Sequence, residues 1–284
     1  MQYHSQKSCL KFVLLGLFAI LILSIIILSS VPPVSRDALT HHLAVPKLYL
    51  NHGEIHEIPS LIFSYYPMNL DLLYIIPLYF GNDIVPKYIH FAFALLTAGL
   101  IFNYLKIRIS TVYGLLGALF FLSLPVIVKL SITVYVDLGL IFFSTCSLIY
   151  LLKWLENEFK FHFLIISAIA CGLALGTKYN ALITLLLLAL FVPYLFAKYH
   201  ASLTSGEDHN NICETSGSKP ELKYITIRVI VCGAVFISIA LIVFSPWMIR
   251  NYLWTDNPVY PLYNGWFNPV PVSYTHLRAH ETRR

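Results

Sequence analysis

Charged residues are scarce in this sequence: only 12% of its 284 residues are Asp, Glu, Lys or Arg, about half of the roughly 25% found in soluble domains. Hydrophobic residues make up 58% and the mean hydropathy is +0.72. A chain with so little polar surface cannot cover its apolar residues in water, so a soluble fold is excluded. The net charge of +5 is small and the basic residues are scattered singly, which argues against a nucleic-acid partner.

Cysteine patterns that indicate disulfides or bound metals are also missing. The five cysteines, Cys9, Cys146, Cys171, Cys213 and Cys232, show neither a CxxC pair nor a Cys/His ligand spacing. Three of them lie inside apolar runs, where cysteine behaves as a small hydrophobic residue. The sequence therefore predicts no disulfide framework and no cysteine metal site.

Long apolar runs recur along most of the chain. A helix that crosses a bilayer needs about 20 predominantly apolar residues, and we assign seven such runs: 10–31, 88–105, 111–130, 134–152, 161–176, 180–198 and 225–245. Lys7 and Lys11 precede the first run, so a secretory signal peptide is the alternative, but no Ala-x-Ala cleavage site follows. The sequence therefore predicts an all-α fold, a polytopic bundle of transmembrane helices.

The segment 69–81 is apolar but short, and Pro77 interrupts it. We interpret it as an interfacial or re-entrant helix inside one long first loop, 32–87. Lys and Arg collect on the cytoplasmic side of membrane proteins, and a cytoplasmic N-terminus places ten of those near span ends on that side and six on the other. The first loop is therefore predicted to be non-cytoplasmic, and the downstream assignments invert if 69–81 crosses.

Two polar stretches stand apart from the predicted spans. Residues 199–224 are rich in Ser, Asn, Gly and Glu, which is typical of a flexible loop, here a cytoplasmic one. Residues 273–284 resemble translated sequencing-adaptor sequence, and a genuine basic tail is the alternative. We therefore expect one transmembrane module over 1–272, continuing further in the natural protein, with 273–284 as a non-native tail.

Side chains that can carry chemistry gather on the predicted non-cytoplasmic side. Leu39 and Leu43 are four residues apart and predict a helix on the membrane surface, whose other face carries Asp37 and His41. Other polar and charged residues on the same side are His42, Lys47, Tyr66, Asp71, Lys87, His90, Asp137, Lys178, Tyr179, Arg250 and Asn251.

Each of these residues alone has an ordinary structural explanation. An acid at a helix start, such as Asp37 or Asp137, is favoured by the helix dipole. Lysines at span ends, such as Lys87 and Lys178, commonly reach toward lipid headgroups. However, two acids and at least three cations on one membrane face together predict a site that binds an anionic headgroup beside a base.

Several short motifs follow one another along the chain. The first loop reads Asp-Ala-Leu-Thr-His-His-Leu-Ala-Val-Pro-Lys-Leu-Tyr-Leu over 37–50, then Tyr-Pro-Met over 66–68 and Asp-Leu-Leu-Tyr over 71–74. Later motifs occupy 135–138, 172–179, 245–247, 250–251 and 257–261. In order and spacing, from residue 10 to about 263, the chain resembles protein O-mannosyltransferase-like membrane glycosyltransferases of the GT-C superfamily.

The resemblance implies a hexosyl- or pentosyltransferase that moves a sugar from a polyprenyl-phosphate donor to a hydroxyl of a glycan, lipid or protein acceptor. It implies Asp37 as the base, although relatives carry a pair of acids in this loop and here Arg36 precedes Asp37. The expected ligands of the donor phosphate are Lys47, Lys87, Lys178 and Arg250. Lys87, Lys178 and Arg250 are expected to converge on one cavity. Supporting or acceptor-binding roles are expected for His41, His42, Tyr66, Asp71, His90, Asp137, Tyr179 and Asn251.

The resemblance implies no certain cofactor. A divalent metal held by Asp37 with His41 or His42 stays open, but adjacent helical residues point about 100° apart and do not easily share one ion. Membrane lipids are expected partners. The expected location is a cell membrane crossed several times, with a bacterial plasma membrane favoured over the endoplasmic reticulum membrane of a eukaryote.

A transporter or lipid flippase is the alternative from a different class, and a non-catalytic scaffold subunit is a third. Transporters place ionisable residues near the bilayer midplane and often show repeated halves. This sequence has almost no charge in the middle of its apolar runs and no visible repeat. The pattern therefore favours an enzyme whose site lies at the membrane edge.

Overall fold

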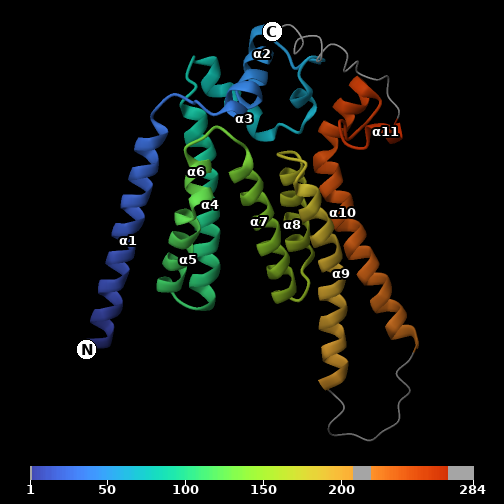
Figure 1. Cartoon of the computed structure of the whole chain (residues 1–284). Helices are drawn as coiled ribbons and strands as arrows, with labels where there is room; N and C mark the ends of the chain where they lie inside the picture. The colour runs from blue at the N-terminus through green and yellow to red at the C-terminus, as the bar shows by residue number, and fades with distance from the viewer. Residues whose placement is uncertain (1, 207–218, 268–284) are drawn as a thin grey trace, which may run out of the picture.

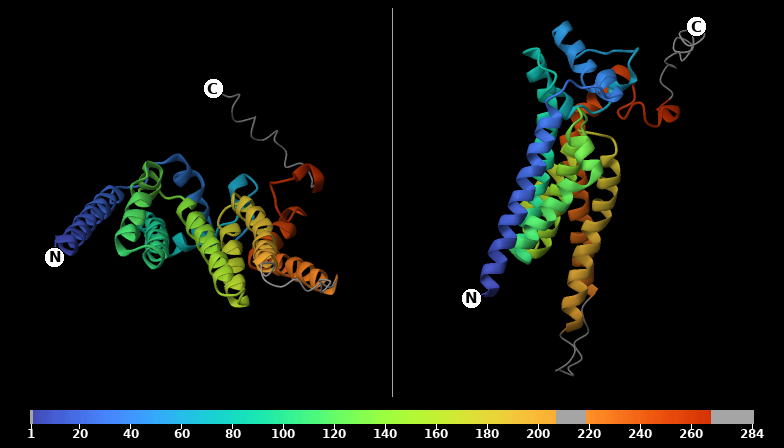
Figure 2. Two further views of the ribbon diagram at one scale, coloured as in Figure 1. Left: turned by 90° about the horizontal axis from the view of Figure 1, so that it is seen from below. Right: turned by 60° about the vertical axis from the view of Figure 1, so that its left-hand side comes forward.

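The computed structural model describes residues 2–206 and 219–267, and within them the chain is helical, with no strand. Five described helices are long and apolar enough to cross a membrane: α1 (Gln2–Ser29), α4 (Val85–Arg108), α7 (Asp137–Glu156), α9 (Ala181–Gly206) and α10 (Lys219–Thr255). They run lengthwise through the molecule (Figure 1), and seen from below α1 and α10 lie at opposite edges of the row (Figure 2). The prediction of an all-α multi-pass membrane protein is confirmed.

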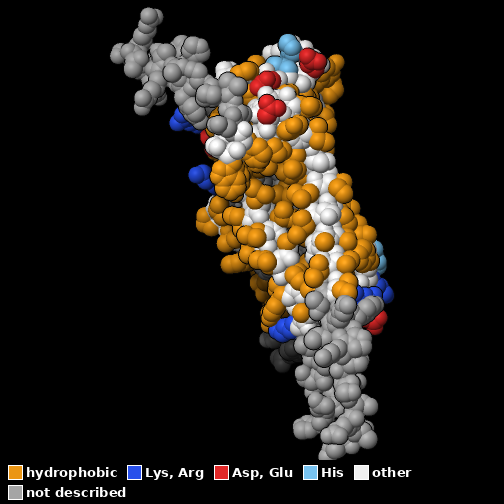
Figure 3. All heavy atoms as spheres, turned by 90° about the vertical axis from the view of Figure 1, so that its right-hand side faces the viewer, with side chains coloured by type: hydrophobic (Ala, Val, Ile, Leu, Met, Phe, Trp, Pro, Cys, Tyr) orange, Lys and Arg blue, Asp and Glu red, His pale blue; other side chains and the backbone are white. Residues whose placement is uncertain are grey.

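The surface of the bundle matches a lipid environment. Large apolar side chains such as Phe12, Ile183 and Ile242 are exposed on the outer faces of the spans. Figure 3 shows one such face, where hydrophobic side chains cover the middle and charged side chains lie toward the two ends. Exposing an apolar surface of this size to water is unfavourable, so this surface marks the part of the chain that lies in the bilayer.

The predicted span 111–130 is wrong as one straight helix. It forms α5 (Thr111–Ser123) and α6 (Pro125–Ser131), which are bent by 68° at the break. Pro125 explains the bend, because a residue before proline avoids the helical region, and Leu124 is extended with ψ 128. The pair is a broken span or a re-entrant loop, and it makes a sixth crossing if it is one span.

Two other predicted spans have different lengths from those expected. The run 161–176 forms α8 (Phe161–Leu175), whose 15 residues fall short of the usual span. The last run continues as α10 through Pro246 to Thr255. Proline removes one backbone donor from a helix. The carbonyl left without that donor, that of Ile242, accepts instead from the Ser245 hydroxyl (2.7 Å).

Short helices form a layer over one end of the bundle, where Figure 1 shows α2 and α3. They are η1 (Ala38–His42), α2 (Ala44–His52), η2 (Ile62–Tyr65) and α3 (Asn69–Tyr79), and α11 (Asn264–Phe267) follows α10. With 11 residues α3 is too short to cross, as expected for the segment 69–81. The long first loop with its own helices is therefore present as predicted.

Asn69, at the start of α3, fastens this layer to the bundle. Its backbone N–H donates to the Gly176 carbonyl (2.9 Å) and its side chain donates to Leu173 (3.3 Å) and accepts from the Trp247 indole (2.8 Å). One residue of the loop therefore bonds both the end of α8 and the upper part of α10. This link fixes the position of α3, which carries Asp71.

Gly172 allows α8 and α10 to approach closely. A Cβ at this position would lie 2.6 Å from the Ala240 carbonyl and 2.6 Å from Val243. We expect Gly172→Ala to lower the free energy of unfolding by about 1–3 kcal/mol, because the backbone of α10 must move. Gly99→Ala is the matched control, since a Cβ there meets nothing within 4 Å. Thermal unfolding of both variants in detergent measures this, and equal melting temperatures would contradict the close approach.

Several sequence predictions concern residues outside the described ranges. The tail 273–284, Cys213 and residues 207–218 of the polar loop 199–224 lie there. The two ends of that predicted loop are helical instead, since α9 continues to Gly206 and α10 begins at Lys219. Among described cysteines, Cys171 and Cys232 are buried and Cys9 is exposed, all as free thiols.

Candidate active site

A cavity of about 520 Å³ lies where the loop layer meets the tops of the bundle helices. Residues from η1, η2, α3, α6, the start of α7 and the turn after α8 line it. Its polar and aromatic lining residues are Asp37, His41, His42, Phe63, Tyr66, Asp71, Tyr135, Asp137, Thr177 and Lys178, and its apolar ones are Pro67, Met68, Val126, Leu130 and Val136. Seven of the thirteen residues selected from the sequence therefore meet in one place.

The helix η1 is a π-helical turn, in which the N–H of Leu43 donates to the carbonyl of Ala38 (2.8 Å). Such wide turns occur frequently at functional sites. Here the turn brings two consecutive histidines, His41 and His42, to the same cavity. The expected pairing of Leu39 and Leu43 on one membrane-facing side is wrong, because Leu43 is buried against α3 while Leu39 is exposed.

Asp37 precedes this turn and lines the cavity. Its side chain makes no capping hydrogen bond to η1, so side-chain capping does not explain this acid. The residue is exposed, so its carboxylate stays available to an acceptor.

His41 packs its ring against Phe63, with centroids 4.2 Å apart and planes tilted by 16°. Burial and the neighbouring His42 lower the pKa of His41 from 6.5 to about 4, and the opposing effect of Asp37 is smaller. At neutral pH this ring is therefore uncharged.

His42 and Asp71 form a buried pair. The His42 Nδ1 lies 2.7 Å from an Asp71 carboxylate oxygen, and the two residues are only 8% and 3% exposed. The ring of Tyr135 lies beside that of His42, with centroids 5.6 Å apart, and the Tyr74 hydroxyl donates to the Tyr135 carbonyl. The imidazole is thus held from both sides, with one edge on the cavity.

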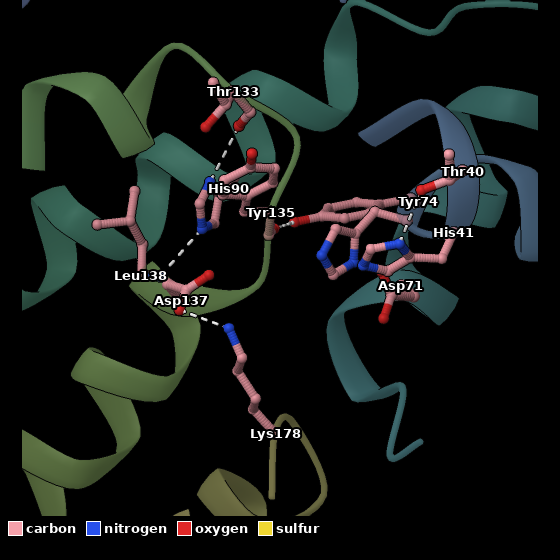
Figure 4. A network of polar contacts seen from close by, with 11 residues as sticks. Thr40, His41, Asp71, Tyr74, His90, Thr133, Tyr135, Asp137, Leu138 and Lys178 are labelled. Carbon is pink, nitrogen blue, oxygen red and sulfur yellow. Dashed lines mark hydrogen bonds and ion pairs between the residues drawn. The ribbon is translucent and has the colours of Figure 1, made fainter. Parts of the chain in front are cut away.

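Lys178 and Asp137 form the second charged pair of the cavity. The Lys178 ammonium lies 2.7 Å from an Asp137 oxygen, and the two side chains are 33% and 27% exposed. Figure 4 shows Lys178 extending from the turn after α8 toward Asp137 at the start of α7. This cation is therefore already neutralised in part by a carboxylate.

His90 supports Asp137 from behind and does not line the cavity. Its Nδ1 lies 3.0 Å from the Leu130 carbonyl and 3.1 Å from that of Thr133, and its Nε2 accepts the N–H of Leu138 (2.9 Å) (Figure 4). Because a nitrogen that accepts an N–H carries no proton, Nδ1 holds the ring hydrogen. The fully buried ring fixes the connection from α6 to α7. The sequence placed this residue among the supporting or acceptor-binding candidates, and the geometry supports the former.

Three of the four predicted phosphate ligands lie away from this cavity, so the expected convergence is wrong. Lys87 is buried and donates to the Val31 carbonyl just beyond the end of α1 (2.6 Å). Lys47 faces Asp83 at 4.0 Å and lines a separate hollow of about 650 Å³ between α2 and α3. Only Lys178 lines the cavity with Asp37.

Arg250 lies one layer behind the cavity wall. Its guanidinium packs against the rings of Trp247 and Trp254 and donates to the Tyr66 carbonyl (3.1 Å) and to Asn251 (2.9 Å). Asn251 in turn donates to the Tyr65 carbonyl (2.8 Å) and to the Tyr179 hydroxyl (3.1 Å). Arg250, Asn251 and Tyr179 therefore hold the loop that carries Tyr66 against α10.

No group of three or more His, Cys, Asp or Glu in the described part of the chain has the geometry of a metal site. The carboxylates of Asp71 and Asp137 already have cationic or imidazole partners. Asp37 with a histidine would supply at most part of a coordination shell. The described residues of the cavity therefore do not fit a metal held by the protein alone.

Of the polar and aromatic lining residues, three were missed by the sequence reasoning. Phe63 stacks on His41, Tyr135 packs beside His42, and Thr177 precedes Lys178. Tyr135 and Thr177 belong to motifs that the resemblance had marked, so their place in those motifs was a usable signal. Phe63 carries no such signal, because an aromatic residue in an apolar loop is common.

Comparison with known proteins identifies the family of this chain. Residues 53–250 match the family described as dolichyl-phosphate-mannose-protein mannosyltransferase. No curated protein and no solved structure gives a match. The matched range contains α3, Asp71, Asp137, Lys178 and Arg250, and it begins after Asp37 and η1. The chain belongs to the dolichyl-phosphate-mannose-protein mannosyltransferase family of membrane glycosyltransferases.

Proposed function

We propose that this protein transfers a hexose, mannose by its family, from a polyprenyl-phosphate donor to an acceptor hydroxyl on the non-cytoplasmic side of the membrane. One observation carries the proposal: an exposed carboxylate, Asp37, and a cation, Lys178, line the same cavity at the membrane edge. A base and an anion-binding group in one site are what this transfer requires.

The reaction follows from these groups. The acceptor oxygen bonds to C1 of the sugar while the bond from C1 to the phosphate oxygen breaks, and its electron pair stays on the phosphate. Asp37 takes the proton of the acceptor hydroxyl. The phosphate gains one negative charge, which Lys178 stabilises, and no proton needs to be given to it.

The apolar wall of the cavity suits a lipid-linked donor. Val126 and Leu130 lie on α6 and Met68 precedes α3, and all three line the cavity. Val126 is exposed. An isoprenoid chain in the bilayer would therefore reach the cavity along α6 and present its phosphate to Lys178.

A transfer assay tests the function. Purified full-length protein in liposomes is given mannosyl-phosphoryl-polyprenol or a nucleotide-linked mannose, with a peptide rich in Ser and Thr or a glycan as acceptor. We expect transfer only from the lipid-linked donor. Transfer from the nucleotide sugar alone, or lipid translocation without transfer, would contradict the proposal, and the latter would favour the flippase alternative.

Labelling of introduced cysteines tests the predicted side of the membrane. In a Cys9→Ser background, Val34→Cys and Asn180→Cys place thiols at exposed positions close to Asp37 and Lys178, and Lys160→Cys places one at the opposite end. We expect a membrane-impermeant maleimide to label the first two in intact cells and the third only after permeabilisation. Labelling of the first two from opposite sides would contradict the shared cavity, and labelling of both only after permeabilisation would reverse the proposed side.

A further inference from the structure

The cavity carries fewer positive groups than an anionic ligand requires. It is lined by three carboxylates, Asp37, Asp71 and Asp137, and by one lysine, Lys178, which is already paired. The described cations that the sequence suggested as additional phosphate ligands lie elsewhere. A lipid phosphate therefore needs a second positive group from the lining itself.

The two histidines are the remaining lining residues that can become positive. His41 is unsuitable, because its ring is packed against Phe63 and its pKa is lowered to about 4. His42 has the opposite surroundings, since a buried carboxylate lies 2.7 Å from its Nδ1. A buried carboxylate requires a hydrogen-bonded or charged partner, and the ring of His42 supplies it.

The pairing also fixes which ring atom faces a ligand. A carboxylate only accepts hydrogen bonds, so Nδ1 of His42 carries a proton toward Asp71. The other nitrogen, Nε2, is left for the cavity that the residue lines. The Tyr135 ring limits rotation of the imidazole.

We propose that His42, held at Nδ1 by Asp71, binds the phosphate of the lipid donor through its Nε2–H and is the second phosphate-binding group beside Lys178. This inference rests on the proposed function, which it deepens. The hydrogen bond strengthens when the bond from C1 to the phosphate breaks, because the phosphate then carries one more negative charge. Asp71 acts through His42 and is a positioning residue.

The test compares the binding of polyprenyl phosphate with that of the uncharged polyprenol, which differs only in the phosphate. His42→Asn keeps an amide N–H near the Nδ1 position for Asp71 and vacates the Nε2 position. Asp71→Asn keeps an acceptor for Nδ1–H and removes the charge. We expect each variant of the full chain in nanodiscs to bind polyprenyl phosphate about ten- to a hundredfold more weakly and polyprenol as the wild type does.

The matched control is His52→Asn, which replaces an exposed histidine of the same loop that lies outside the cavity and should change phosphate affinity by less than about twofold. Undiminished preference for polyprenyl phosphate in His42→Asn would overturn the assignment while leaving the proposed function intact. Equal loss in His52→Asn and His42→Asn would overturn it as well, by showing that the loss does not depend on a histidine of the cavity. A wild-type protein that binds the two lipids equally would contradict the proposed function itself.

Discussion

Asp37→Asn is expected to slow sugar transfer by about 10²–10⁴-fold while leaving membrane insertion and lipid-phosphate binding unchanged. Asn has the shape of Asp and can still accept hydrogen bonds, but it cannot take the proton of the acceptor hydroxyl. Asp37 is exposed on the cavity and makes no side-chain bond to η1, so the substitution removes no contact that stabilises the fold. The measurement is the rate of transfer at saturating donor, with donor binding determined separately.

Asp83→Asn is the control for this experiment. Asp83 is an acid of the same first loop, but it lies outside the cavity and faces Lys47 at 4.0 Å. Its replacement should change the transfer rate by less than about twofold, because an exposed ion pair at this distance contributes little. If Asp37→Asn also transferred at the wild-type rate, Asp37 would not be the base, and Asp137 would be the next carboxylate to test.

The sequence predicted the helical architecture well because the membrane imposes it. A bilayer demands about 20 apolar residues per span, and this demand is visible in composition without knowledge of any contact. The failures are local. Leu124 before Pro125 breaks one expected span, while Ser245 allows α10 to continue past Pro246. Proline thus ended a helix at one position and not at the other, and at the second the freed carbonyl of Ile242 accepts from the Ser245 hydroxyl.

The acids of the site were easier to predict than the cations. Asp37, Asp71 and Asp137 all line the cavity, whereas only Lys178 of four predicted cations does. Long basic side chains can reach many backbone carbonyls and rings, and their partners are hard to predict from the sequence. Lys87 bonds the carbonyl of Val31, a residue far from it in the sequence, so that bond becomes visible only in the folded chain. Arg250 packs between Trp247 and Trp254, which lie at helical spacing from it on α10, so this contact was open to prediction.

The histidine pair shows the same limit in a different form. Helical spacing of 100° per residue argued that His41 and His42 point apart, but η1 is a π-helical turn that places both on the cavity. Nothing in Ala-Leu-Thr-His-His predicts that turn. The different surroundings of the two rings, Phe63 for one and Asp71 for the other, also depend on chain segments more than 20 residues away.

Lys178→Met is expected to lower kcat/KM by about 10²-fold, because it removes the one lysine on the cavity and with it the group that meets the developing phosphate charge. Asp137→Asn leaves the cation in place and loses only its anchor, so we expect a decrease of less than about tenfold. Both side chains are about one-third exposed, and a pair of this kind contributes only about 0–1 kcal/mol to stability. A large loss of rate therefore cannot be explained by unfolding.

The reversed pair, Lys178→Asp with Asp137→Lys, separates the two roles of the lysine. It restores an ion pair between the same backbone positions, so thermal stability should return to within about 1 kcal/mol of the wild type. It also moves the cation from the turn after α8 to the start of α7, away from the place where it would meet the phosphate. We therefore expect transfer by the reversed pair to stay as slow as in Lys178→Met. Recovery of transfer together with stability would show that the pair only holds α7 against the turn after α8, and the phosphate would then need a ligand other than Lys178.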